Sequence, residues 1–246
     1  MEGDNIIKNK TIRERIKPII LDPGFLLTYS NLRTFKNIFN YIKNENLKIL
    51  DLGCGYKPFK QFFSSSSEYI GIDFGAESAE PDIVLDLNIQ KLPFFNDYFD
   101  IVIISETLEH LYNIHFVIRE AVRVVKKGGL IFISTPFIFP EHGHPFDFFR
   151  YTAYFYDQIA KEYGLKIITL RKATTIIGSW FFLTNIVIFY LISKIPLMKI
   201  VFYPVFVINN ILGFIGDKVM ITLGNKIDIF KRSSVLYAGI SVIFQK

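Results

Sequence analysis

Cysteine is almost absent from this chain of 246 residues, which contains Cys54 alone. An internal disulfide framework is therefore excluded. Residues 1–17 are polar and lack the apolar core of a secretory signal, so we expect the protein to stay in the cytoplasm. A basic stripe interleaved with stacking aromatic residues is also missing, so the net charge of +5 does not predict a nucleic-acid partner.

Charged residues are missing from two long segments, 173–193 and 200–216. Half of all residues are hydrophobic and the mean hydropathy is +0.31, so the chain is more apolar than an ordinary soluble domain. The first segment is about long enough to cross a bilayer, which needs roughly 20 apolar residues, and the second is marginal. Pro204, Asn209 and Asn210 in the second segment would be costly in lipid unless they face protein or the interface.

An apolar run that breaks into closely spaced glycines is the clearest motif of the chain. Residues 47–55 read LKILDLGCG, which predicts a buried strand that ends at Asp51 and turns tightly through Gly53 and Gly55. A second short strand brings Asp73 to the same sheet edge, where its carboxylate can accept hydrogen bonds from both hydroxyls of a ribose. Together these residues predict a site for a nucleotide-type ligand.

The residue three positions after Gly55 distinguishes a dinucleotide site from other nucleotide-type sites. A dinucleotide site needs a small residue three positions after the second glycine, but this chain has Pro58 there. A nicotinamide-dependent oxidoreductase is therefore disfavoured. The run from Asp51 to Gly55 instead resembles motif I of the class I S-adenosylmethionine-dependent methyltransferases, and within them the type 11 methyltransferases. The resemblance implies S-adenosylmethionine as the cofactor, with Asp51, Gly53 and Gly55 among its contacts.

Later motifs of the same family follow in order. The resemblance implies that Asp73 binds the ribose and that Asp86, in DIVLDLNIQKLPF, lies near the adenine. Segment 99–111, FDIVIISETLEHL, resembles motif IV, which faces the methionine part of the cofactor. Its matching polar positions are Ser105, Glu106 and Glu109. We expect the first two of these at the cofactor and the third at the substrate. Segment 117–136 resembles the helix, glycine turn and fifth strand of such domains.

This resemblance implies an α/β fold, a Rossmann-like, doubly wound, seven-stranded and mostly parallel sheet with an antiparallel last strand. Segments 165–171 and 234–244 fit the sixth strand and the last strand, so the apolar region is a helical insertion before the last strand. The expected division is an N-terminal segment and helix (1–46), a cofactor-binding core (47–172), an apolar and membrane-associated insertion (173–216), and a connector with the last strand (217–246).

Five local features complete this expectation. Residues 31–41 show helical spacing and predict a helix before the first strand. Residues 74–81 are too few for a crossover helix, so a loop or a single turn is expected. Many family members have a further glycine where this chain has Lys57, which makes the loop less permissive there. A small side chain explains Cys54 inside the turn better than a nucleophile does, and Asp100 is expected to be structural.

The expected substrate side is segment 137–152, FIFPEHGHPFDFFRYT, which follows the fifth strand at the ligand-binding edge of the sheet. Its pattern resembles a subgroup of these methyltransferases with an H-G-x-P-x-D-[YF]-x-R-Y-T signature. The expected substrate-binding residues are Glu109, Glu141, Arg150 and Tyr151. The alternative for Glu141 and Arg150 is that they pair with each other and hold the loop.

A neutral oxygen acceptor needs a base, because methyl transfer is an in-line displacement by an acceptor that has lost its proton. His144 is the first candidate and His142 the second, with Asp147 orienting the imidazole. A zinc site from these two histidines is disfavoured, because no cysteines accompany them and His110 and His115 give no familiar ligand spacing. No metal is therefore expected.

The apolar insertion connects two neighbours of one sheet, so both of its ends stay on the same side of a membrane. A spanning hairpin would place Lys194 and Lys199 across the bilayer, against the tendency of basic loops to stay inside. Helices that lie in the interface or dip into one leaflet are favoured instead, and buried helices or a dimer interface are the alternative. The basic residues beyond Arg171 suit anionic headgroups. They are Lys172, Lys194, Lys199, Lys218, Lys226, Lys231, Arg232 and Lys246.

The expected function is methyl transfer from S-adenosylmethionine to an oxygen of a lipid-linked, glycan or quinone-like acceptor, at the inner face of a membrane. The rival from another class is a non-catalytic, membrane-bound module that retains the cofactor fold. The oligomeric state is left open by the sequence.

Overall fold

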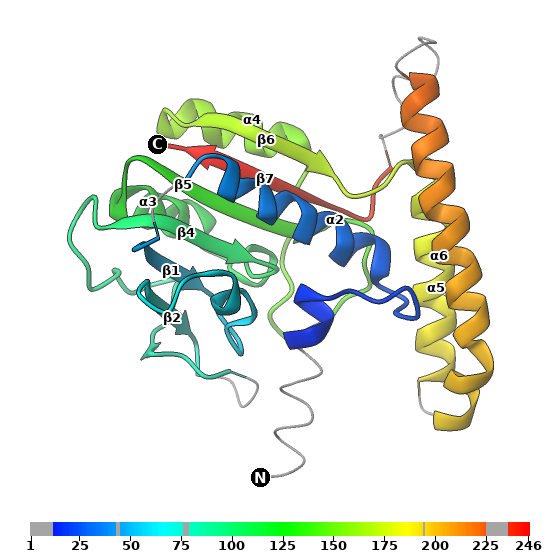
Figure 1. Cartoon of the computed structure of the whole chain (residues 1–246). Helices are drawn as coiled ribbons and strands as arrows, with labels where there is room; N and C mark the ends of the chain where they lie inside the picture. The colour runs from blue at the N-terminus through cyan, green and yellow to red at the C-terminus, as the bar shows by residue number, and fades with distance from the viewer. Residues whose placement is uncertain (1–11, 43–44, 76–78, 194, 225–235) are drawn as a thin grey trace.

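The computed structural model describes residues 12–42, 45–75, 79–193, 195–224 and 236–246, and its centre is one seven-stranded sheet (Figure 1). The strands are β1 (Lys48–Leu52), β2 (Glu68–Asp73), β3 (Ile83–Val84), β4 (Phe99–Ser105), β5 (Val125–Pro136), β6 (Lys166–Lys172) and β7 (Gly239–Gln245). Their order in the sheet is β3-β2-β1-β4-β5-β7-β6. Strand β7 is antiparallel to both neighbours, and the pairs from β3 to β5 are parallel. The predicted fold class is confirmed.

The order of the strands fixes where a ligand can bind. The chain runs outward from β1 through β2 to β3 and then returns to β4 on the other side of β1. Open sheets of this type bind ligands where the strand order reverses, outside the carboxyl ends of the strands. That point lies between the ends of β1 and β4, at Leu52 and Ser105. Strand β7 begins at Gly239, since residues 236–238 are described and do not belong to it, whereas Ser234, the expected start, lies outside the described residues.

Helices cover both faces of the sheet, which is why β1 and β4 are largely apolar and buried. One face packs against α3 (Ile114–Val124) and α4 (Ala153–Tyr163). The other packs against α2 (Phe25–Lys36) and the short helix η2 (Pro58–Phe62), where Phe35, Phe59 and Phe132 meet. Two further short helices are η1 (Asn37–Asn40) and η3 (Leu108–His110), and residues 12–16 are helical as well.

Two sequence predictions differ from the structure in extent. The helix expected at 31–41 begins earlier, as α2 at Phe25, and ends in the 3-10 turn η1. The earlier start is explained by the buried residues Leu26 and Leu27, which pack against the apolar helices near the C-terminal end. Between β2 and β3, the described residues of 74–82 form no helix, as expected for so short a connection.

The apolar insertion is a pair of helices, α5 (Ile176–Ile192) and α6 (Pro196–Gly224), which follows β6 and precedes β7 in the chain. The pair stands beside the sheet (Figure 1). The longer helix comes from the second apolar segment, contrary to expectation. Helix α5 has 17 residues, whereas the part of α6 at Ile200–Leu223 is long and apolar enough to cross a membrane by length and composition, which is weak evidence. Lys194 and segment 225–235, with Lys226, Lys231 and Arg232, lie outside the described residues.

Polar side chains fasten this helical pair to the core. Asn185 donates to Asn210 at 3.0 Å and accepts from Asn209 at 2.8 Å, and Asn210 donates to the carbonyls of Ile20 at 2.8 Å and Asp22 at 2.9 Å. The asparagines therefore face protein, which removes the cost that lipid would impose on them.

The N-terminus of α5 is held by α6. Asp217 accepts hydrogen bonds from the N–H of Thr175 at 2.7 Å and of Gly178 at 3.1 Å. A Cβ at Gly178 would lie 2.2 Å from the Asp217 carboxylate, so only glycine permits this approach. A charged residue thus lies inside the long apolar helix because it caps the neighbouring one.

Candidate functional site

Backbone conformation at the end of β1 opens a space beside the strand ends. Gly53 has φ +72°, donates its N–H to Ile72 at 2.8 Å, and lies so close to Thr107 that a Cβ would be 2.2 Å from that side chain. Gly55 has φ +50° and donates its N–H to Asp73 Oδ2 at 2.9 Å. Lys57 adopts φ +53°, so a lysine here takes the left-handed conformation that glycine favours.

Two carboxylates flank this turn in different environments. Asp51 is 2 % exposed and accepts a hydrogen bond from the Tyr69 hydroxyl, and burial raises the pKa of its carboxyl to about 7. Asp73 accepts hydrogen bonds from Gly55 and from the N–H of Phe74 at 2.8 Å. Cys54 is buried, and its burial raises the pKa of the thiol, which fits a structural residue better than a nucleophile.

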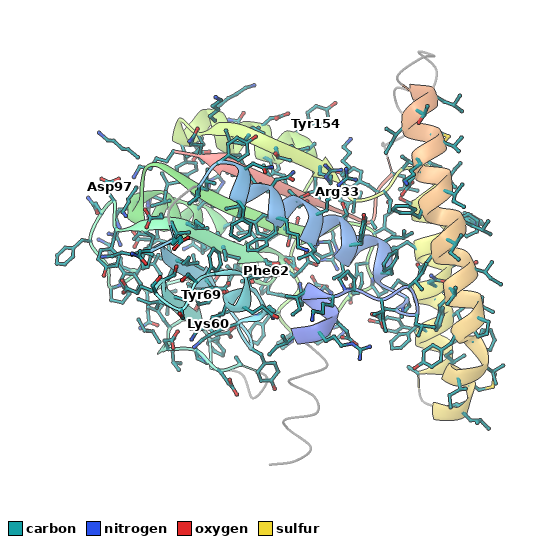
Figure 2. The ribbon with its side chains drawn as sticks, in the orientation of Figure 1. Arg33, Lys60, Phe62, Tyr69, Asp97 and Tyr154 are labelled. Carbon is teal, nitrogen blue, oxygen red and sulfur yellow. The ribbon has the colours of Figure 1, made fainter. Side chains whose placement is uncertain are left out.

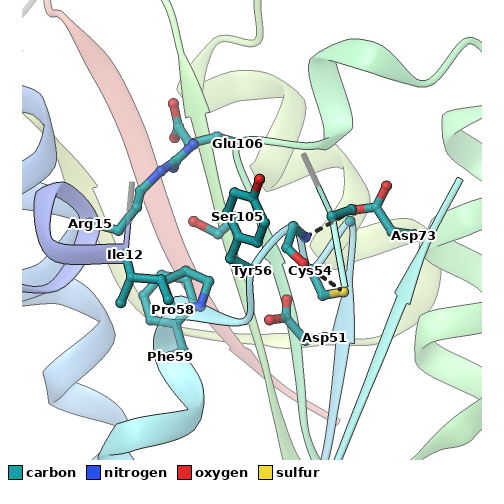
Figure 3. Close-up of a pocket in the computed structure, with 13 residues that line it drawn as sticks. Ile12, Arg15, Asp51, Cys54, Tyr56, Pro58, Phe59, Asp73, Ser105 and Glu106 are labelled. Atoms are coloured by element: carbon teal, nitrogen blue, oxygen red, sulfur yellow. Dashed lines mark hydrogen bonds between the residues drawn. The ribbon is translucent and has the colours of Figure 1, made fainter. Parts of the chain in front are cut away.

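A cavity of about 260 Å³ lies over the turn (Figure 3). It is lined by six of the residues predicted to hold the cofactor, namely Asp51, Gly53, Gly55, Asp73, Ser105 and Glu106. The seventh, Asp86, lines an adjoining cavity of about 440 Å³ with Phe74 and Phe146, whose ring centroids are 6.3 Å apart. The structure therefore brings all seven residues to one continuous region at the reversal point of the sheet.

Glu106 occupies the central position of this region. It follows β4 with φ +51°, an uncommon conformation for a residue other than glycine, and such outliers are often found at functional sites. Its carboxylate accepts a hydrogen bond from Asn31 Nδ2 at 3.0 Å, and Figure 3 shows the Arg15 side chain extending toward it. Arg15 and Ile12 also line the 260 Å³ cavity, and no pattern in the sequence indicates this role for them.

A third cavity, of about 490 Å³, begins at Ser105 and Glu106 and extends to the helical pair. Its far end is lined by Phe139 and by residues of α5 and α6, which are Ile186, Phe189, Tyr190, Tyr203 and Phe206. Glu106 lines all three cavities. An apolar space and a nucleotide-sized space therefore meet at one carboxylate.

The loop expected to bind substrate is held mainly by its own ion pair. Arg150 donates to both oxygens of Asp147, at 2.6 and 2.8 Å, which lowers the pKa of the Asp147 carboxyl. The partner of Arg150 is thus Asp147 and not Glu141, which is exposed and lines none of these three cavities. Tyr151 is buried and donates to the carbonyl of Leu108 at 2.9 Å, so Arg150 and Tyr151 hold the loop in place.

Asp147 lies beside His142 and not beside His144. Asp147 Oδ2 accepts a hydrogen bond from the N–H of His142 at 3.0 Å and lies 3.4 Å from His142 Nδ1, whereas His144 is exposed. The ring of His142 packs edge-on against His110, with centroids 4.8 Å apart. Both rings lie next to the fully buried Glu109, whose carboxyl has a raised pKa because of burial and the nearby Glu106. Burial also lowers the pKa of His110.

Known proteins resemble this chain in sequence and in fold. Residues 50–133 match the model of a family described as a methyltransferase domain. A relative named ubiquinone biosynthesis O-methyltransferase, from Pelagibacter ubique, is 25% identical over 143 residues, which are 54% of this chain and 49% of the relative. A mitochondrial protein of the same name from Rattus norvegicus is 34% identical over 108 residues, 36% of this chain and 30% of the relative.

The fold matches that of a SAM-dependent methyltransferase from Archaeoglobus fulgidus with a TM-score of 0.52, at 14% identity and over 97% of this chain and 99% of the other. Residues 50–133 therefore resemble a methyltransferase domain, and the fold of the chain matches that of an S-adenosylmethionine-dependent methyltransferase. The chain spans about half or less of the length of these curated relatives.

Proposed function

We propose that the protein transfers a methyl group from S-adenosylmethionine to an oxygen of a quinone-like or lipid-linked acceptor at the inner face of a membrane. The observation that carries this proposal is the position of Glu106, where the cavity over the glycine turn meets the apolar cavity beside the helical pair. The names of the relatives, which include an O-methyltransferase of ubiquinone biosynthesis, support an oxygen acceptor with a quinone-type ring.

The cofactor is assigned to the two smaller cavities. Asp73 is placed at the ribose, because each of its oxygens accepts one backbone hydrogen bond and retains a lone pair for a hydroxyl. The adenine is assigned to the 440 Å³ cavity, between Asp86 and the rings of Phe74 and Phe146. The methionine part then lies along Asp51, Gly53 and Ser105, which brings the methyl group toward Glu106.

Methyl transfer to a hydroxyl forms one carbon–oxygen bond and breaks one carbon–sulfur bond, whose electron pair stays on sulfur in S-adenosylhomocysteine. The hydroxyl proton must leave at the same end of the site. We assign its removal to Glu106, which lines all three cavities, while Asp147 acts as a positioning residue for the nearby His142. The surface position of His144 does not favour it as the base.

Membrane attachment is assigned to the outer face of the helical pair, whose side chains stand clear of the core (Figure 2). Its most exposed large residues are Leu191 (76 %), Leu197 (71 %) and Trp180 (70 %). Apolar side chains at such exposure, with asparagines turned inward, suit helices that lie in the interface. An acceptor with an apolar tail could then pass from the bilayer into the 490 Å³ cavity.

The methyltransferase proposal is tested with purified protein, labelled S-adenosylmethionine and extracts of total membrane lipid. Transfer of label into the lipid fraction is expected. Cofactor binding without transfer to any fraction would favour the non-catalytic module, and absence of binding would overturn the assignment of the cofactor. A calorimetric competition between S-adenosylmethionine and a nicotinamide dinucleotide also tests the disfavoured oxidoreductase.

Flotation with anionic phospholipid vesicles tests the membrane proposal. The triple variant Trp180→Gln, Leu191→Gln and Leu197→Gln should stay with the soluble fraction while the natural protein floats with the vesicles. Phe95→Gln with Tyr154→Gln is the matched control, because both residues are 83 % exposed and belong to the core, Phe95 in the segment before β4 and Tyr154 in α4 (Tyr154 is labelled in Figure 2). Equal flotation of all three proteins would remove the helical pair from this role.

A further inference from the structure

Three side chains that could bind a metal ion meet beside Glu106. Glu109 and His110 belong to η3, directly after β4, and His142 comes from the loop after β5. The Nε2 atoms of His110 and His142 lie 3.8 and 3.9 Å from the same oxygen, Glu109 Oε1. One ligand atom from each residue can be chosen so that all lie within 4.8 Å of one another.

Both imidazoles are oriented for binding through Nε2. His110 Nδ1 is in hydrogen-bonding contact with the carbonyl of Phe146, and His142 Nδ1 lies 3.1 Å from the carbonyl of Pro140. A carbonyl only accepts, so each Nδ1 carries the proton and each Nε2 has a free lone pair. Asp147, held in turn by Arg150, gives His142 a second acceptor near Nδ1. Metal-binding histidines show this outer arrangement as a rule.

The buried carboxyl between the imidazoles lacks a partner in either protonation state. Glu109 is 0 % exposed, and neither of its oxygens has a hydrogen-bond partner among the described residues. If ionised, it is a buried charge close to Glu106, which is costly without a cation. If protonated, its hydroxyl faces nitrogens at 3.8 and 3.9 Å, which is too far for a hydrogen bond.

We propose that Glu109, His110 and His142 bind one divalent transition-metal ion of the zinc type. Two imidazoles and one carboxylate suit such ions and leave coordination positions open for water or substrate. Around a tetrahedral ion with bonds of about 2.1 Å, ligand atoms lie roughly 3.4 Å apart. The Glu109 oxygen would therefore approach each nitrogen by about half an ångström, and ligand atoms that are as much as 4.8 Å apart would approach by up to about 1.4 Å. The sequence alone predicts no metal because the ligands come from two segments and His144 does not take part.

This site would act on the acceptor, and that role rests on the proposed function. The acceptor hydroxyl binds at an open position of the ion, and its proton passes to the carboxylate of Glu106. The resulting oxygen then attacks the methyl carbon as the carbon–sulfur bond breaks, with the ion unchanged in oxidation state. A bound hydroxyl loses its proton more readily than a free one, which is the usual contribution of such an ion.

Calorimetric titration of untagged protein with Zn²⁺ tests the site without any measurement of activity. One ion is expected per chain, and Glu109→Gln, His110→Ala and His142→Ala should each weaken binding by at least about tenfold, since even residues behind the ligands contribute 10- to 100-fold. Co²⁺ should give a visible absorption band that Zn²⁺ abolishes. His115→Ala and His144→Ala are the controls and should keep the affinity for Zn²⁺, because neither residue contributes a ligand.

The affinity for S-adenosylmethionine is measured in the same variants and shows that each one is folded. Weak binding that is equal in all variants would reveal adventitious surface histidines and overturn the proposal, as would absence of binding. Zinc binding in a protein without affinity for S-adenosylmethionine would overturn the proposed function but keep the metal site. Binding of S-adenosylmethionine without binding of zinc would overturn the metal site but leave the proposed function standing.

Discussion

The two ends of the site are built in different ways. At the cofactor end, the contacts join the ends of neighbouring parallel strands, as between Gly53 and Ile72 or between Gly55 and Asp73. At the acceptor end, the cavity walls come from the N-terminal segment, α2, the loop after β5 and the helical pair. The first end depends on backbone conformation within one short motif, whereas the second depends on which distant segments meet.

The comparison predicts that the cofactor end tolerates the least change in backbone. Gly53→Ala should lower the free energy of unfolding by about 2–5 kcal/mol, because the positive φ costs about 1–2 kcal/mol and the overlap with Thr107 adds about 1–3 kcal/mol. Gly128→Ala is the matched control, with φ +80° and no atom within 4 Å of the added Cβ, and should cost only about 1–2 kcal/mol, which is the cost of the positive φ. If urea denaturation gives similar losses of unfolding free energy for the two variants, the contact with Thr107 is unimportant.

Burial at the same end should make stability depend on pH through Asp51. Its pKa is about 7 in the folded protein against an ordinary value of 3.8, so between these values folding takes up a proton. The stability contributed by the protonated group is complete below about pH 4 and is lost as the pH rises through about 7, with a slope of at most about 1.4 kcal/mol per pH unit. Unfolding curves of Asp51→Asn should lack this slope, and parallel pH profiles of the two proteins would contradict the assignment.

Replacing Asp73, the residue proposed to bind the ribose, should change cofactor affinity without changing stability. Asp73→Ala should weaken the affinity for S-adenosylmethionine by about 1–3 kcal/mol, or roughly 5- to 150-fold, through lost charge-assisted hydrogen bonds, and the domain should remain folded. Asp97→Ala serves as the control, since this carboxylate is exposed and pairs with Lys246 at 2.8 Å. Calorimetry that shows unchanged affinity for Asp73→Ala would remove the ribose assignment.

The sequence predicted the sheet and the positions of the cofactor residues because both depend on local patterns. Apolar runs that end at Asp51, Asp73 and Ser105 mark strand ends, and strand ends of a parallel sheet meet at one edge. The length of α6 was missed for a physical reason. The absence of charge ends the expected segment at Gly216, but α6 continues through Asp217, whose carboxylate caps α5.

At the acceptor end, the sequence indicates which polar residues gather there, but it does not indicate which of them contact each other. Asp147 and Arg150 pair over a short distance in sequence, yet Glu141 offered an equally plausible partner until the loop conformation was known. The approach of His110 to His142 joins two segments separated by a whole strand and helix, and no periodicity encodes it. The same applies to Asn31 and Glu106, which are brought together by the packing of α2 on the sheet.

The smallest effect is expected where the apolar cavity meets α5, and it tests whether the two ends act separately. Phe189→Ala removes part of the wall of the 490 Å³ cavity, so an acceptor with an apolar tail should lose about 1 kcal/mol of binding, or roughly fivefold in kcat/KM. The affinity for S-adenosylmethionine should not change, because Phe189 lines neither smaller cavity. Tyr154→Ala, on the exposed face of α4, should alter neither quantity. A loss of cofactor affinity in Phe189→Ala would mean that the helical pair supports both ends and that the division between them is wrong.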